Sequence, residues 1–423
     1  MSALGSQDKS WSAFQGFPLK PFGRRSPLGL GEFPLARRGS VLVVCLSQSW
    51  GGLEQVAVSD AIDVAGLGVS VKFLCFENSP LHQKIIAHPK IEVIPLSFVP
   101  RNFCDLKLRG ELIKAVDQGV HLVHTHQTTL LGSLVPWLWN HPSVGLIASR
   151  HMMNSHNKKD FIHRTLYSRV DALVVVSEAI RGNLLETHSI REKKVKVIRL
   201  GVDFERFDPA RVDPLLQRRL WGVEPDTQLI GLVGRIDPAK GQATFIKAAA
   251  GLIKDWEGRS KLKFVIIGEE TRGAESNHLS ELRDMVDQFR LGHSVLFTGY
   301  QDNIPQVMSA LDVVVMPSRQ EAFGLVAIEA MAMQCPVVIS RGGSAQEIVG
   351  DEECGLLVRP DDAFDLQRQL RFFLDHPDVR VRMGHKARLH VQTWFDRKKR
   401  LVNTMSLYEL VLRRRRASLT EPA

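Results

Sequence analysis

Short runs of Val, Ile and Leu recur along the chain and alternate with amphipathic stretches such as residues 111–119. The runs are continuously apolar, which is typical of strands buried on both faces of a parallel sheet. The intervening stretches have the periodicity of helices that cover such a sheet. Strand, helix and strand in succession predict βαβ units and therefore an α/β fold. The predicted strands are 40–46, 69–76, 91–94, 121–126, 144–149, 171–177 and 195–198 in the first half, and 229–234, 263–268, 294–299, 312–317, 336–340 and 355–358 in the second.

The strand pattern stops near residues 206–214, where prolines and charges predict a linker, and then restarts. We expect two doubly wound Rossmann-like domains, over 40–205 and 215–390, followed by C-terminal helices and a tail over 391–423. Two such domains joined by one linker face each other across a cleft. Because ligands of open parallel sheets bind beyond the carboxyl ends of the strands, this cleft is the expected site and hinge closure the expected motion.

Residues 1–39 are rich in Gly, Pro and Ser and carry six Lys or Arg against two Asp or Glu. They predict a disordered basic leader or a start assigned too early. No apolar core of a secretory signal follows, and no run of about 18 apolar residues predicts a membrane span. The five cysteines are scattered without metal spacing, which predicts buried thiols in a reducing, cytoplasmic compartment.

The formal net charge of +9 permits several kinds of anionic partner. Nucleic acid would be one, but no aromatic-interleaved basic ribbon, zinc finger or RNA-recognition signature is present. Sugar phosphates and anionic lipid headgroups explain the charge equally well. We therefore expect no nucleic-acid partner.

Two turns after predicted strands are candidates for binding phosphate. The first contains Gly51 and Gly52 just before a helix, where backbone N–H groups can approach an anion closely. The second carries Arg235 and Lys240, a guanidinium and an ammonium that could grip a diphosphate. Taken alone, each is also consistent with an ordinary turn. The absence of a GxGxxG sequence in the first turn argues against a nicotinamide cofactor.

The segment 321–332, EAFGLVAIEAMA, places two carboxylates inside an apolar stretch. Glu321 precedes a helix expected to begin near Phe323 or Gly324, so the N–H groups of Phe323, Gly324 and Leu325 would form a phosphate seat. Glu329, further along that helix, could accept both hydroxyls of a ribose. The alternative is a pair of buried acids neutralised by Arg or Lys.

These motifs together resemble the retaining nucleotide-sugar glycosyltransferases of GT-B fold, specifically glycosyltransferase family 4. The segment 321–332 is similar to the family's E-x7-E motif, 234–241 to its G-R-x-x-x-x-K-G and 50–54 to its Gly-Gly loop. Residues 336–349 and 354–362 resemble the stretch that follows E-x7-E. One departure is Leu200, where the family usually has Asn before Gly-Val-Asp.

The resemblance implies a role for each candidate residue. Gly51, Gly52, Arg235 and Lys240 would meet the diphosphate of a nucleotide-sugar donor, Glu329 the ribose and Glu321 the transferred sugar. His151 matches a position where the family often has a histidine near the sugar, although a loop histidine bonded to backbone is the alternative. The implied catalytic residues are Glu321, His151, Arg235 and Lys240.

A metal site is not expected. His124 and His126 share one face of a predicted strand and His121 lies on the other, while a zinc site needs further ligands. His126 could line the cleft and His124 the core. No D-x-D sequence is present to hold Mg²⁺ or Mn²⁺ on a sugar nucleotide. Fixed cations and a helix N-terminus would replace the metal, so no cofactor is expected.

The acceptor is expected on the N-terminal domain. Residues 150–199 contain 11 Lys or Arg against 5 Asp or Glu, which suits a glycan or lipid-linked acceptor at an anionic membrane or else an ordinary solvated face. The run 413–416, RRRR, could complement a helix dipole or contact lipid. By family habit, these features predict lipopolysaccharide or surface-polysaccharide synthesis at the cytoplasmic face of the inner membrane. The alternatives are a phosphorylase, a sugar-nucleotide epimerase or a non-catalytic sensor.

Overall fold

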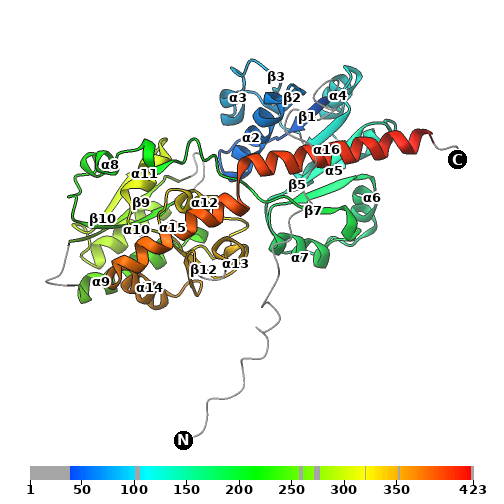
Figure 1. Cartoon of the computed structure of the whole chain (residues 1–423). Coiled ribbons are helices and arrows are strands. Elements are labelled where there is room, and N and C mark those ends of the chain that lie inside the picture. The colour runs from blue at the N-terminus through cyan, green and yellow to red at the C-terminus, as the bar shows by residue number, and fades with distance from the viewer. Residues whose placement is uncertain are drawn as a thin grey trace, which may run out of the picture.

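The computed structural model describes residues 39–100, 105–256, 261–270, 277–319, 321–350 and 353–420. The predicted basic leader, apart from Gly39, lies outside these residues. The chain forms two lobes, each built on one sheet (Figure 1). Among the described residues, none of the helices combines the length and apolar character that a membrane span requires.

The first sheet has seven parallel strands in the order β3-β2-β1-β4-β5-β6-β7. Its central strands are buried along their length, as the continuous apolar runs predict. The strands are β1 (Ser40–Val44), β2 (Ser70–Phe76), β3 (Ile91–Leu96), β4 (Leu122–Thr125), β5 (Gly145–Arg150), β6 (Ala172–Val175) and β7 (Val195–Val197). The helices of this lobe are α2 (Gly52–Gly66), α3 (Pro80–Ile85), α4 (Leu106–Asp117), α5 (Leu131–Leu138), α6 (Phe161–Arg169) and α7 (Glu178–Thr187).

The second sheet has six parallel strands in the order β10-β9-β8-β11-β12-β13. The strands are β8 (Gln228–Val233), β9 (Leu262–Ile267), β10 (Val295–Gly299), β11 (Val313–Met316), β12 (Val337–Ser340) and β13 (Leu356–Val358). The helices are α8 (Pro214–Leu220), α9 (Gln242–Asp255), α10 (His278–Gln288), α11 (Ile304–Ala310), α12 (Leu325–Ala332), α13 (Ala345–Val349), α14 (Ala363–Asp375) and α15 (Pro377–Trp394). Every strand expected from the sequence is present, and the α/β fold with two doubly wound sheets is confirmed.

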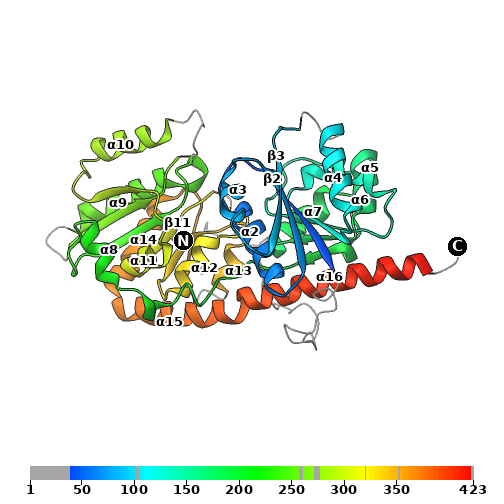
Figure 2. The same cartoon turned by 90° about the horizontal axis from the view of Figure 1, so that it is seen from above.

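The last helix, α16 (Arg397–Thr420), leaves the second lobe and packs on the first, and α15 and α16 together run along both lobes (Figure 2). Its first turn donates bidentate ion pairs to α2, Arg397 to Asp63 at 2.7 Å and Arg400 to Asp60 at 2.6 and 2.9 Å. Arg400 and Asp60 are both buried. The crossing from one lobe to the other is therefore fixed by two ion pairs, of which the Arg400–Asp60 pair is buried away from bulk water.

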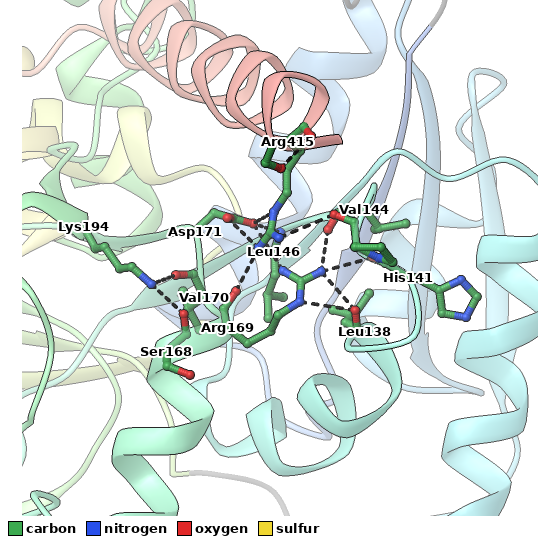
Figure 3. Close-up of polar contacts among 12 residues, drawn as sticks. Leu138, His141, Val144, Leu146, Ser168, Arg169, Val170, Asp171, Lys194 and Arg415 are labelled. Atoms are coloured by element: carbon green, nitrogen blue, oxygen red, sulfur yellow. Dashed lines mark hydrogen bonds and ion pairs between the residues drawn. The ribbon is translucent and has the colours of Figure 1, made fainter. Parts of the chain in front are cut away.

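Toward its far end, α16 docks on the first lobe through Arg415 of the RRRR run (Figure 3). Arg415 forms an ion pair with Asp171 at 2.7 Å, and Asp171 also accepts the Leu146 N–H at 2.8 Å. Arg169, beside Asp171, donates to the carbonyl oxygen of Val144 at 2.7 Å. Arg415 thus serves tertiary packing, a role that the sequence-based alternatives of helix dipole or lipid contact did not include.

Candidate active site

The predicted site residues follow the central strands of both sheets. The strand order reverses between β1 and β4 in the first sheet and between β8 and β11 in the second. The loops after these four strands carry the Gly-Gly turn, His126, the Arg235–Lys240 turn and Glu321. Ligands of doubly wound sheets bind at such reversal points, because the two flanking loops diverge there. The fold therefore places the candidates where a ligand is expected.

Lys240 and Glu321 form an ion pair. Lys240 Nζ donates to Glu321 Oε2 at 2.8 Å, and the two side chains are 32% and 17% exposed. The turn that ends in Lys240 lies close to the end of β11, because Gly241 is left-handed at φ +76° and a Cβ there would lie 2.2 Å from the Pro317 carbonyl oxygen. The structure thus brings together a cation and a carboxylate 81 residues apart.

Arg235 lies at the same turn but pairs within it. Its guanidinium donates to Asp237 Oδ2 at 2.8 Å, and half of the Arg235 side chain is exposed. The Gln242 amide donates to the Arg235 carbonyl oxygen at 2.8 Å and fixes the backbone. Arg235 therefore forms its ion pair within the turn, and its role at a diphosphate stays a prediction.

Helix α12 begins at Leu325, slightly later than the sequence predicts. Gly324 precedes it in the left-handed region, at φ +86°, and supplies no side chain to cap the helix. The Ala327 N–H donates to the Gly324 carbonyl oxygen at 3.0 Å, whereas the N–H groups of Leu325 and Val326 have neither an intrahelical acceptor nor a capping side chain among the described residues. Ser344 holds the preceding loop, because its Oγ donates to Phe323 O at 2.5 Å and its N–H to Glu321 O at 3.3 Å.

Glu329 lies one turn into α12 and is half-buried. Its carboxylate makes no hydrogen bond or ion pair with another residue that the structure describes. Burial raises the pKa of Glu329 to about 7, and the charge of Arg206 opposes that rise only in part. A carboxylate that is poorly satisfied and close to neutrality is suited to receive hydroxyl donors from a ligand.

The Gly-Gly turn is organised by a carboxylate. Glu54 accepts the Gly51 N–H at 2.9 Å and the Ser47 and Ser49 hydroxyls at 2.6 and 3.2 Å. The Gly51 N–H is thus engaged as the capping box of α2, whereas the sequence-based prediction assigned it to a diphosphate. A Cβ on Gly52 would lie 3.6 Å from Leu325 Cδ1, so Gly52 faces the start of α12 across the two domains.

Three histidines lie side by side at the end of β4 and β5. His126 Nδ1 is 3.3 Å from His151 Nε2, and the two rings stack with centroids 5.4 Å apart. His124 bonds instead to Tyr408 and Ser149, at 2.6 and 2.8 Å. No group of three or more His, Cys, Asp or Glu side chains in the described ranges is arranged to hold a metal ion.

Both site histidines are neutral at physiological pH. Burial, reinforced by the charge of Arg400, lowers the pKa of His151 to about 3, and burial holds the pKa of His126 well below its usual range. The Nε2 atom of His126 is buried without a hydrogen-bond partner. The sequence predicts catalysis by His151 and only a lining position for His126, although His124 and His126 lie on the same face of their predicted strand.

Comparison with known proteins identifies the architecture. Residues 50–206 match the model of Glycosyltransferase Family 4, and residues 216–390 match that of Glycosyl transferases group 1. The chain belongs to glycosyltransferase family 4. Its fold is the GT-B fold, as the two facing sheets and the similar structures show.

Individual relatives agree with this family. A D-inositol 3-phosphate glycosyltransferase from Saccharomonospora viridis is 27% identical over 81% of this chain and 85% of its own length. A glycosyltransferase structure from Rickettsia africae has a TM-score of 0.79 at 20% identity, covering 89% of this chain and 99% of that one. Anabaena HepE in complex with UDP and glucose has a TM-score of 0.74 at 20% identity, covering 87% and 98%.

Proposed function

We propose that this glycosyltransferase moves a hexose from a nucleotide diphosphate to an acceptor hydroxyl with retention of anomeric configuration. The observation that supports the proposal is the Lys240–Glu321 pair beside the uncapped start of α12. A cation and free helical N–H groups together favour a pyrophosphate, and a carboxylate there can accept sugar hydroxyls. Glu329 would bind the ribose.

Catalysis would come chiefly from electrostatics. The bond to the anomeric carbon breaks as negative charge develops on the departing diphosphate, and Lys240, Arg235 and the N–H groups of α12 would stabilise that charge. His151 and His126, both neutral, would orient the sugar and acceptor by hydrogen bonds. Domain closure would exclude water and align the acceptor hydroxyl. No cofactor is needed for these steps.

The donor is proposed to be a UDP-hexose, because the similar HepE structure holds UDP and glucose. A thermal-shift screen of UDP, GDP and ADP, each with its common sugars, tests this. A ligand that binds only the folded state raises the melting temperature. At a hundredfold excess of ligand over Kd, it increases the free energy of unfolding by about 2.7 kcal/mol. A melting temperature that rises with UDP or a UDP-sugar, but not with the GDP or ADP compounds, supports the proposal. A melting temperature that no nucleotide changes contradicts it.

The acceptor is proposed to be a glycan or phosphate-bearing polyol in lipopolysaccharide or surface-polysaccharide synthesis. The curated relative acts on an inositol phosphate by its name, and the N-terminal domain carries the basic segment 150–199. Incubation with UDP-[¹⁴C]glucose and a panel of such acceptors should label one class. Labelling of inorganic phosphate instead would show a phosphorylase.

We further propose peripheral contact of α6 with an anionic membrane. Phe161 at its first position is 81% exposed, the next residue Ile162 is also exposed, and Lys158 and Lys159 precede them. Exposed apolar side chains beside lysines suit an anionic lipid interface. Co-sedimentation with phosphatidylglycerol vesicles should fall for the Phe161→Ser, Ile162→Ser double variant. The control is Leu389→Ser, which removes a 65% exposed apolar side chain from α15.

A further inference from the structure

Arg150, the last residue of β5, carries a cation that no carboxylate of the described residues neutralises. Its Nη1 donates to Thr128 Oγ1 at 3.1 Å, while its Nε is buried without a partner. Burial lowers the pKa of this half-buried guanidinium. A cation withdrawn from water costs several kcal/mol when nothing opposite in charge meets it. The Arg150 guanidinium is therefore able to bind an anionic group of a ligand.

Two further basic groups lie beside Arg150. His188 is buried, and its pKa falls to about 4 because of burial first and then the nearby charges of Arg150 and Lys158. Lys158 lies close to His188, since the backbone N–H of Lys158 donates to the carbonyl oxygen of Thr187 at 2.7 Å. No acid of the described chain pairs with Lys158. Arg150 and Lys158 are cations and His188 is a neutral imidazole beside them, and we call these three residues the Arg150 cluster.

The hydrogen bonds of His188 fix its tautomer. Thr187 Oγ1 donates to the Asn183 carbonyl oxygen at 2.6 Å, so it accepts a proton from His188 Nδ1 at 2.8 Å. The opposite nitrogen, Nε2, then carries a lone pair, and it is buried without a partner. His188 thus offers an acceptor for a hydroxyl next to the cations. A ligand that offers an anion to the cations and a neighbouring hydroxyl to His188 would be a phosphorylated polyol.

The cluster adjoins the proposed active site. Arg150 directly precedes His151, and Thr128, which anchors the guanidinium, lies two residues after His126. Arg150 with His151 and Thr128 with His126 lie at the carboxyl ends of two parallel strands, which is the edge of such a sheet where ligands bind. The two side chains have different neighbours, since Arg150 contacts Thr128 whereas His151 stacks on His126. A substituent of an acceptor held by His151 could reach across this edge.

We propose that Arg150 and Lys158 form an anion subsite for a phosphate group carried by the acceptor, with His188 Nε2 accepting a neighbouring hydroxyl. This rests on the proposed transferase function, because it assigns part of that acceptor. The phosphate makes charge-assisted hydrogen bonds with the free guanidinium atoms and neutralises the cluster. It also fixes which acceptor hydroxyl faces the donor.

The first test is thermal, with inorganic phosphate as the probe. Phosphate should raise the melting temperature of the wild-type protein above that in sodium chloride of equal ionic strength. Arg150→Met should make this increment smaller while leaving the phosphate-free melting temperature equal or higher, since it removes a half-buried charge without a counter-ion. The increment that remains comes from phosphate at the Lys240 site, so an increment as large in Arg150→Met as in the wild type overturns the subsite. A large drop in melting temperature with the increment retained would show a purely structural arginine.

The second test is kinetic. Arg150→Met should raise KM for the acceptor at least tenfold and leave KM for the donor within twofold. Lys158→Met should act in the same direction with a smaller factor, and it keeps the test valid if the first variant does not fold. Arg191→Met, which removes an exposed arginine from the same domain, is the matched control and should change neither constant. Equal effects of Arg150→Met and Arg191→Met would contradict the proposal.

Two further binding experiments distinguish a soluble phosphorylated acceptor from a phospholipid headgroup. They also test the subsite independently of the proposed transferase activity. A soluble inositol phosphate and phosphatidylglycerol vesicles are each titrated against wild-type and Arg150→Met protein. Loss of binding in the variant in either arm supports the subsite and names its source, and retained binding in both overturns it. UDP stabilisation is measured in parallel, so a protein that binds no donor but responds to phosphate through Arg150 refutes only the transferase.

Discussion

Lys240 and Glu321 keep each other in place while remaining partly open to water. Their contact joins two loops of the C-terminal domain, and neither side chain is fully buried. A pair of this kind contributes only about 0–1 kcal/mol to stability, because solvent screens it. Its value to the protein therefore lies in positioning charge at the site.

Lys240→Ala is expected to lower turnover about 10²–10³-fold, because it removes one stabilising charge from the leaving diphosphate. The melting temperature should change by only a few degrees, for the reason just given. Glu321→Ala should have an effect of similar size, and the double variant should be far from additive because the residues act together. Near-normal activity of both single variants would refute the assignment.

Glu329 has opposite effects on stability and on binding. Its folded pKa of about 7 lies above the unfolded value of 4.5, so the unfolded state loses its proton first as pH rises. This group therefore makes the protein less stable between pH 4.5 and 7, and the cost stays constant above that range. Glu329→Gln should stabilise the protein at pH 8 by roughly 1–3 kcal/mol and have no effect below about pH 4.5.

Ionisation of Glu329 lowers the stability of the fold but should increase the affinity for the donor. A carboxylate accepts both ribose hydroxyls, so the donor KM of the wild-type enzyme should rise as pH falls below 7. Glu329→Gln should raise the donor KM at pH 8 and flatten that profile. The control Asp284→Asn, an exposed acid of α10, should alter neither curve. A pH-independent donor KM in the wild-type enzyme would rule out this role.

At the scale of elements, α12 and α13 are held together by glycines at close approaches. Gly343 is left-handed at φ +52°, and a Cβ there would lie 1.8 Å from the Glu321 carbonyl oxygen. No side chain larger than hydrogen can occupy this contact without moving the loop that carries Glu321. The start of α13 therefore sets the position of the loop before α12.

Gly343→Ala is expected to displace the Glu321 loop and lower kcat/KM for the donor by at least tenfold. Gly222→Ala is the matched control, since it has the same left-handed conformation at φ +63° but open space around its Cβ. Both variants carry the backbone strain of about 1 kcal/mol, and only the first carries the clash. Steady-state kinetics and thermal melts distinguish the two, and equal activities would contradict the argument.

At the scale of the whole molecule, a carboxylate of the C-terminal domain reaches into the N-terminal one. Glu347 of α13 accepts the Ala179 N–H at the start of α7 at 3.1 Å and pairs with Arg199 at 3.3 Å. Ser177, just before α7, donates to the carbonyl oxygen of Ala322 at 3.2 Å. The N-terminal domain therefore touches the loop between Glu321 and Phe323 directly.

Glu347→Gln should loosen this contact, because the amide keeps a hydrogen bond but loses the charge that faces the helix N-terminus and Arg199. We expect kcat/KM to fall about tenfold, within the usual range of coupling energies. Small-angle scattering should show a larger radius of gyration in the presence of UDP. Asp378→Asn breaks an exposed ion pair with Arg382 and serves as control. An unchanged radius and unchanged kinetics would exclude a role in closure.

The strands and the chemistry of the site could be predicted from sequence because both are local. Continuous apolar runs mark strands buried on two faces, and Lys240, Glu321 and Glu329 stand out as charges beside such runs. Helix α12 begins at Leu325, one or two residues after the predicted start, because Gly324 adopts a left-handed conformation instead of a helical one. The engagement of Gly51 by Glu54 was missed for a similar reason, since a cap depends on geometry.

Apolar periodicity along the chain is enough to predict the strands in their chain order, their grouping into two sheets and the residues at the strand ends. Packing settles which of these residues meet: Lys240 with Glu321, His126 with His151, and Gly52 with Leu325. Packing also brings α16 back to the first domain and leaves Arg150 without a counter-charge among the described residues. Periodicity and propensity act between neighbours along the chain, whereas ion pairing and burial depend on distances that exist only after both sheets have packed.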